Sequence, residues 1–233
     1  MLINQESKTI QFGVRERQLN ESQGLKVAYI MSRFPKLTET FILYEMLSMR
    51  QQGIQVEVYP LLRERGEIMH PEAVQFVEAA HFQPFISSPI VRANLHFLWK
   101  KPFVYLKTLW DLLRSNWGSF NFFTGVIGIF PKTVLFAYQM RADNVQHVHA
   151  HFASHPAAAG FIIHRLVGIP YSFTAHGSDL HRDRHMLREK VAEAEFVAAI
   201  SEYNKELIIS ECRGNYREKV NVVHCGVDTE VFR

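Results

Sequence analysis

Short apolar runs alternate along the chain with longer segments in which apolar residues recur at helical spacing. Continuous apolar runs are typical of parallel strands covered on both faces, and the helical spacing is typical of helices packed on one side. The runs that predict strands are 25–31, 55–62, 82–86, 147–152, 171–175, 196–200 and 220–224. This alternation predicts an α/β fold, a Rossmann-like parallel sheet with helices on both faces and right-handed crossovers.

The first strand, helix and strand show the pattern most completely. A proline-marked loop follows strand 25–31, Thr38 is placed to cap a helix, and Gly53 is placed to end it. A short helix over 71–80 follows the second strand. Residues 1–24 are polar and aperiodic, which predicts a loose tail rather than a signal peptide, so the folded domain is expected over 25–233.

Residues 88–142 differ in character, because they are rich in Phe, Trp and Leu, and they predict a helical insertion of two or three helices. One interpretation is that the aromatic residues are core. The other places aromatic side chains and lysines at a membrane interface. The residues concerned are Trp99, Trp110, Trp117, Lys100, Lys101 and Lys107. The uncharged stretch 115–131 is too short and too polar for a spanning helix.

Three further helices are expected after the insertion. They cover 154–167, a charged segment at 183–194, and a segment that Ser201 caps and that runs to about Cys212. The 233 residues carry a formal net charge of only +3, which argues against nucleic acid as a partner and favours anionic substrates or an anionic membrane surface. Cys212 and Cys225 stand in no metal or redox spacing, which indicates reduced thiols in a cytosolic protein.

The strongest chemical signal is the run 171–175, which opens directly onto His176-Gly177-Ser178-Asp179. A buried strand therefore delivers a histidine to its carboxyl end, which is where open α/β sheets bind ligands. Glycine at such a point lets the backbone approach a ligand closely. His176 is the leading candidate for catalysis, and a buried histidine satisfied by the backbone is the structural alternative.

Two other groups of residues are candidates. Period two places His147, His149 and His151 on one face of a strand, with His151 nearest the cleft. Aligned imidazoles invite zinc, but same-face residues diverge along a strand and no carboxylate follows at ligand spacing, so no metal is predicted.

Arg33, Lys36 and Thr38 precede the first helix. They are candidates for binding an anion at its N-terminus, with solvated loop residues as the alternative. The first turn lacks the glycine pattern of dinucleotide-binding folds, which disfavours an oxidoreductase.

Four stretches carry a resemblance. They are Ser32-Arg33-Phe34-Pro35-Lys36-Leu37-Thr38-Glu39-Thr40-Phe41, His149-Ala150-His151-Phe152-Ala153, Phe173-Thr174-Ala175-His176-Gly177-Ser178-Asp179, and Val223-His224-Cys225-Gly226-Val227-Asp228 with Phe232. In this order and spacing they resemble the N-terminal domain of a GT-B fold glycosyltransferase of family 4, and in particular exopolysaccharide enzymes of the colanic-acid-biosynthesis type.

The resemblance implies an acceptor-side half that works with a second, donor-binding half. Sugar would pass from a nucleotide-sugar, a co-substrate, to a glycan or polyprenyl-linked acceptor with retention and without a metal. His176 would contact the donor sugar, the loop 32–38 would line the cleft, and Gly177, His151 and Asp179 would form its wall.

The family's donor half carries a Glu-x7-Glu pattern. Glu64 and Glu72 match only its bare spacing, so the donor half is expected to be absent from the chain or supplied in trans. The alternative is a catalytically incompetent acceptor-binding or assembly module that pairs with a separate chain. The expected location is the cytoplasm, with peripheral contact at the inner face of the membrane.

Overall fold

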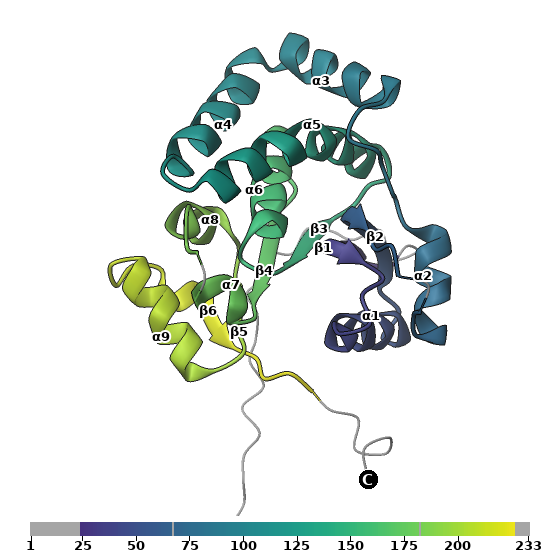
Figure 1. Cartoon of the computed structure of the whole chain (residues 1–233), viewed down its shortest axis with the longest axis vertical. Helices are drawn as coiled ribbons and strands as arrows, with labels where there is room; N and C mark the ends of the chain where they lie inside the picture. The colour runs from purple at the N-terminus through teal and green to yellow at the C-terminus, as the bar shows by residue number, and fades with distance from the viewer. Residues whose placement is uncertain (1–23, 67, 182, 227–233) are drawn as a thin grey trace, which may run out of the picture.

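A computed structural model of the protein describes residues 24–66, 68–181 and 183–226 (Figure 1). The predicted tail lies outside the described residues except for Gly24. Val227, Asp228 and Phe232, the end of the fourth stretch, lie outside them as well.

The core of the fold is a parallel sheet of six described strands in the order β2-β1-β3-β4-β5-β6. Its strands are β1 Lys26–Phe34, β2 Gln55–Arg63, β3 His147–His151, β4 Tyr171–Ala175, β5 Val197–Ala199 and β6 Val220–Val222. The predicted strand at 82–86 is wrong, because these residues are irregular. Pro84 lacks the N–H that a strand needs there, and Phe85 and Ile86 are exposed.

Helices cover both faces of the sheet, which confirms the predicted fold class (Figure 1). The helices are α1 Thr40–Gln51, α2 Val74–Ala79, α3 Ser88–Lys100, α4 Pro102–Ser115, α5 Phe120–Ala142, α6 His155–Val167, α7 Ser178–His181, α8 Leu187–Glu193 and α9 Glu202–Glu211. Two 3₁₀ turns, Pro71–Ala73 and Arg217–Lys219, precede α2 and β6.

Side-chain alternation in β1 shows how the faces are divided. Val27, Tyr29 and Met31 pack in one hydrophobic cluster with α1 and α2, whereas Ala28 and Ile30 pack in a second cluster with α5 and α6. In the adjacent strand β3, Val148 and Ala150 join the second cluster. The intervening histidines therefore lie on the face of Tyr29, as period two predicts.

The predicted helix boundaries hold in part. Glu39, not Thr38, is the N-cap of α1, and its side chain makes no capping hydrogen bond. Gly53 follows the helix with a φ of +83°, as expected of a helix-ending glycine. Ser201 caps α9 by accepting a hydrogen bond from the Asn204 N–H at 3.2 Å. The charged helix predicted at 183–194 is shorter, because Met186 adopts a left-handed conformation before α8 begins.

Residues 88–142 form three helices. The first part of this segment is divided between α3 and α4, because Pro102 cannot continue α3. α5 runs unbroken through Gly125, Gly128 and Pro131. A Cβ on Gly125 would lie 1.9 Å from His155 Nε2, so glycine permits the close contact with α6. Although α5 is long and apolar enough to span a membrane, 56% of its most apolar window is buried within the fold.

Candidate functional site

The candidate site lies where β3 and β4 end side by side. The two strands pair in parallel with His151 beside Thr174, so the chain beyond them brings His151 and His176 together. His151 Nδ1 and His176 Nε2 are 3.1 Å apart and share one hydrogen bond. The structure thus places the leading catalytic candidate against one of the predicted wall residues.

Asp179 connects the ends of these two strands. Its Oδ1 accepts from the His176 N–H at 3.0 Å, and its Oδ2 accepts from the Ala153 N–H at 2.5 Å. Burial raises the pKa of the Asp179 carboxyl against the opposing effect of these backbone donors. Gly177, which lies between His176 and Asp179, has a φ of +99°, a conformation that favours glycine. Asp179 therefore faces the backbone and fixes both loops.

Two phenylalanines enclose the ring of His176. The ring of Phe41, from the first turn of α1, lies 4.5 Å from it between centroids, and that of Phe152 lies 4.8 Å from it. Phe152 has a φ of +80°, a strained conformation for an aromatic residue. Such strain persists where the surroundings fix it, and here it directs the Phe152 ring at His176.

His176 is neutral at physiological pH. Burial lowers its pKa to about 4, the charge on His151 lowers it further, and Glu45 opposes the shift. A neutral imidazole carries one N–H and one lone pair, so the tautomer of His151 decides which nitrogen of His176 faces the cleft as a donor.

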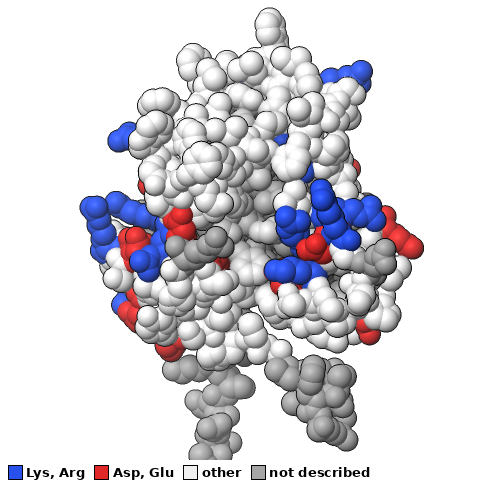
Figure 2. Space-filling model, in the orientation of Figure 1, with Lys and Arg blue, Asp and Glu red and all other residues white. Residues whose placement is uncertain are grey.

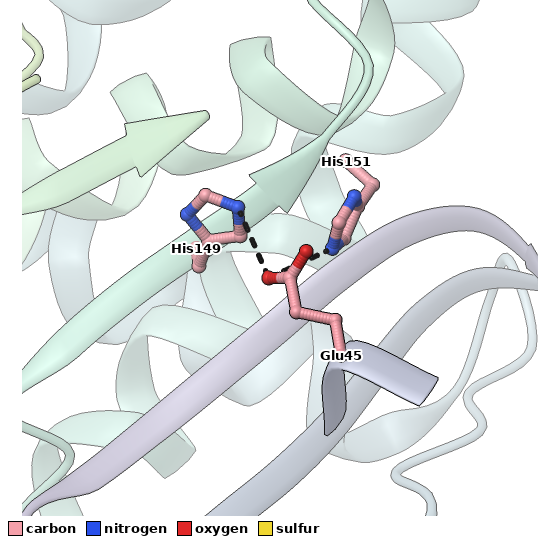
Figure 3. Close-up of side chains that lie close together, drawn as sticks. All are labelled: Glu45, His149 and His151. Carbon is pink, nitrogen blue, oxygen red and sulfur yellow. Dashed lines mark ion pairs between the residues drawn. The ribbon is translucent and has the colours of Figure 1, made fainter. Parts of the chain in front are cut away.

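Glu45 is the site residue that the sequence reasoning missed. It projects from α1 between two imidazoles, with its Oε1 3.5 Å from His151 Nε2 and 3.8 Å from His149 Nε2 (Figure 3). The Tyr29 hydroxyl donates to the same oxygen at 3.0 Å. Burial opposes ionisation of Glu45, but the hydrogen bond and charge of His151 outweigh it and hold its pKa well below the usual range.

Of the other strand histidines, His149 is buried and His147 is partly buried, and both are hydrogen-bonded. Ser172 Oγ lies 2.7 Å from His147 Nε2 and 2.8 Å from His149 Nδ1, while His149 Nε2 lies 3.0 Å from Thr174 Oγ1. Burial lowers the pKa of His147 to about 4 and that of His149 to about 3. Both are therefore neutral.

Of the predicted anion-binding residues, Arg33 lies near the end of β1, and Lys36 and Thr38 lie on the loop between β1 and α1. Arg33, Lys36 and Thr38 are all exposed, and Lys36 Nζ pairs with Glu39 Oε1 at 2.6 Å. The cavity under this loop is about 10 Å³, room for one water molecule at most. The loop leads into the turn that carries Phe41, so it borders the His176 site.

A second feature lies on the outward side of α3 and α4. Trp99, Phe103, Trp110 and Trp117 are 83%, 87%, 63% and 77% exposed. We call the exposed apolar side chains of these helices and the turn after them the outer stripe. Its members are Val91, Leu95, Leu98, Trp99, Phe103, Val104, Leu106, Trp110 and Trp117. They follow spacings of three, four and seven residues, so each helix is apolar on its outer as well as its inner side.

The core interpretation is confirmed for the inner side of these helices. Ile90, Ala93, Phe97 and Leu112 are buried against α5 and its neighbours, as core. The predicted interfacial tryptophans are on the outer stripe. Figure 2 shows this part of the surface, over the helices at the top of Figure 1, as mostly uncharged with scattered basic groups.

Comparison with a solved structure at a TM-score above 0.5 supports the fold class. The Anabaena protein HepE, solved with UDP-glucose, matches 89% of this chain with 46% of its own, at a TM-score of 0.53 and 13% identity. UDP-N-acetylglucosamine 2-epimerase from Rickettsia bellii matches at 0.48 and 11%, with coverages of 87% and 45%. Sucrose-phosphate synthase from Thermosynechococcus elongatus matches at 0.45 and 10%, with coverages of 89% and 49%. The chain thus spans about half the length of these structures.

The fold and the HepE match define the class, the Rossmann-like half of a GT-B fold. The family model described as Glycosyltransferase Family 4 matches residues 118–231. These findings confirm the resemblance to an N-terminal domain of a family 4 glycosyltransferase. Three of the four stretches lie within the matched range, apart from Phe232 of the last one, and the stretch beginning at Ser32 lies outside it. No curated protein sequence matches at a significant level.

Proposed function

We propose that this chain is the acceptor-side half of a glycosyltransferase that moves a sugar, with retention, from a nucleotide-sugar donor to a glycan or lipid-linked acceptor in polysaccharide biosynthesis. The observation that carries the proposal is the position of His176 at the carboxyl end of β4, in a chain that matches family 4. The half that binds most of the donor would follow in a longer chain or come from a partner chain.

The geometry around His176 suits this reaction. Glycosyl transfer passes through an oxocarbenium-like centre while a nucleotide diphosphate leaves, so the site must stabilise charge and exclude water. A neutral His176 presents an N–H to a sugar hydroxyl without adding positive charge beside that centre. Phe41 and Phe152 keep water from two sides of its ring. The exposed Arg33 and Lys36 would meet donor phosphates or the acceptor.

The experiment is to substitute His176→Ala in the complete two-domain enzyme and to measure turnover with a panel of nucleotide-sugars. We expect turnover to fall by at least about 100-fold, the effect of removing one preorganised donor. The matched control is His96→Ala, which removes an exposed histidine of α3 and should leave turnover unchanged. Near-normal turnover of a folded His176→Ala enzyme would refute the catalytic role.

The outer stripe supports a peripheral membrane location for this function. Residues 88–117 contain five basic side chains, Arg92, Lys100, Lys101, Lys107 and Arg114, and one acidic side chain, Asp111. Tryptophan and phenylalanine beside lysine and arginine suit the headgroup region of an anionic bilayer. We infer that the outer stripe rests on the cytoplasmic face of the membrane, where a polyprenyl-linked acceptor would be held.

Vesicle sedimentation tests the membrane contact. The chain should bind vesicles that contain phosphatidylglycerol and should lose most of this binding when Trp99, Phe103 and Trp110 are all replaced by Ser. Tyr203→Ser is the control, because Tyr203 is an exposed aromatic residue on α9, away from the stripe. Equal binding by the triple variant would contradict the proposal. A dimer in sedimentation analysis that the triple variant abolishes would instead assign the stripe to a second copy.

The outer stripe also favours the second candidate function, a binding or assembly module without activity of its own. Such a module would capture a lipid-linked acceptor and pair with a separate donor-binding chain. Acceptor binding without donor binding or product, in an experiment that includes every chain that copurifies, would favour this candidate over the glycosyltransferase.

A further inference from the structure

Glu45, His149 and His151 form a cluster that differs from the hydrogen-bonded histidines around it. Their potential ligand atoms, one from each residue, all lie within 4.8 Å of one another. Figure 3 shows the carboxylate of Glu45 pointing between the two imidazoles. We propose that these three residues bind one divalent transition-metal ion, with Zn²⁺ as the reference occupant.

The chemistry of the donor set favours a transition metal. Two imidazoles and one carboxylate suit zinc, iron and their neighbours, whereas magnesium and calcium prefer oxygen ligands alone. The sequence argument against zinc was that no carboxylate stands near the histidines in the chain. The fold supplies one from α1, more than a hundred residues away.

The distances are close to those of an occupied site. Ligand atoms about 2.1 Å from a tetrahedral ion lie about 3.4 Å from each other. Glu45 Oε1 is 3.5 Å from His151 Nε2 and 3.8 Å from His149 Nε2. Small side-chain movements would bring the three atoms onto one ion, and the His149 Nε2 contact with Thr174 Oγ1 would be exchanged for the metal bond.

A buried nitrogen that lacks a well-formed hydrogen bond points into the same space. Within the described part of the chain, His151 Nε2 makes no hydrogen bond of ordinary geometry, and Glu45 Oε1 lies 3.5 Å from it, although the His151 side chain is 0% exposed. Buried polar atoms are otherwise nearly always paired. The Glu45 side chain is 40% exposed, so an ion has an entry path on the side of α1.

The outer contacts also match those of metal-binding histidines, whose second ring nitrogen usually donates a hydrogen bond. His149 Nδ1 has Ser172 Oγ at 2.8 Å, and His151 Nδ1 has His176 Nε2 at 3.1 Å. Tyr29 orients the carboxylate of Glu45. Both imidazoles are therefore held with Nε2 towards Glu45.

Metal binding would also fix the state of His176. With the ion on His151 Nε2, the proton of His151 stays on Nδ1, and this N–H donates a hydrogen bond to His176 Nε2. His176 then carries its own proton on Nδ1, as a donor to the cleft. This consequence rests on the proposed function, whereas metal binding itself does not.

The test is calorimetric titration of the metal-free full chain with ZnCl₂, followed by the same titration of variants. We expect one site with micromolar or tighter affinity and no binding of Mg²⁺. Glu45→Gln should weaken Zn²⁺ binding by at least about 100-fold, and Ser172→Ala, which removes an outer contact, by about 10-fold. The matched control is Glu57→Gln, because Glu57 pairs with a single histidine, His81, elsewhere on the sheet.

Absence of saturable Zn²⁺ binding to the full chain would overturn the proposal, as would unchanged binding by a folded Glu45→Gln variant. If that variant does not fold, Co²⁺ replaces zinc in the unaltered chain. An intense visible absorption band from a four-coordinate ion with nitrogen ligands supports the site, and the weak spectrum of hydrated Co²⁺ overturns it. None of these outcomes depends on glycosyl transfer, so failure here leaves the proposed function standing.

Discussion

Two regions differ in which kind of side chain they bury. They are the histidine site at the ends of β3 and β4 and the outer stripe on α3 and α4. At the first, polar side chains are buried and held by one another. At the second, large apolar side chains are exposed to water. Burial of polar groups and exposure of apolar ones are both unfavourable for an isolated domain, so each is a sign of function rather than of folding.

The comparison can be tested first on the two sides of one helix. Phe97, on the inner side of α3, is 2% exposed, and Trp99, on the outer side, is 83% exposed. Phe97→Ala should reduce the free energy of unfolding by about 3 to 5 kcal/mol, because it leaves a cavity. Trp99→Ala should change it by no more than about 0.5 kcal/mol. Urea denaturation of both variants measures this. A large loss from Trp99→Ala would show that the outer stripe is core.

Acidification should act on the histidine site. The pKa values of His147, His149 and His176 are lowered to about 4, 3 and 4, below the value of about 6.5 in an unfolded chain. The unfolded state therefore takes up protons first, so stability is full above about pH 6.5 and is lost as the pH falls towards 4.

The free energy of unfolding should drop by at least about 3 kcal/mol between pH 7 and pH 4. Urea denaturation at each pH gives this value, and the Trp99→Ala variant should show the same dependence, since the outer stripe has no part in it. Stability that stays constant down to pH 4 would contradict the buried, neutral state of these histidines.

The smallest expected effect comes from Ser172, whose single hydroxyl serves both His147 and His149. Ser172→Ala should cost about 1 to 2 kcal/mol, because it leaves buried nitrogens without a partner. Thermal denaturation measures the loss. Ser210→Ala is the control, since this serine is exposed on α9. Equal effects of the two substitutions would mean that the polar contacts of the strand face contribute little.

The fold was largely predictable from the sequence. Continuous apolar runs identified all six described strands, and Gly53, Pro102 and Ser201 mark helix ends for local reasons. Other features were missed. Thr38 has the chemistry of a cap, yet the helix begins two residues later. The apolar run 82–86 forms no strand, because Pro84 lacks the N–H that a strand needs there.

The site was predictable only where one strand determines it. The common face of His149 and His151 followed from period two, and the position of His176 followed from the end of a strand. Glu45 was not found, because its approach depends on the crossing of α1 over β1 and β3. The one sequence signal was its spacing of four from Phe41, which places both side chains on the same side of α1.

The two backbone hydrogen bonds that Asp179 accepts limit how the lengths of the loops after β3 and β4 can change. The Asp179 carboxylate accepts hydrogen bonds from the N–H groups of Ala153 and His176. Lys190 Nζ donates to the Ala153 carbonyl at 2.5 Å. One extra residue in either loop would pull a donor away from its acceptor, so neither loop can change length alone. Insertions and deletions among relatives should therefore avoid 151–153 and 175–179, and a natural length change in one of these loops should be accompanied by a change in the other.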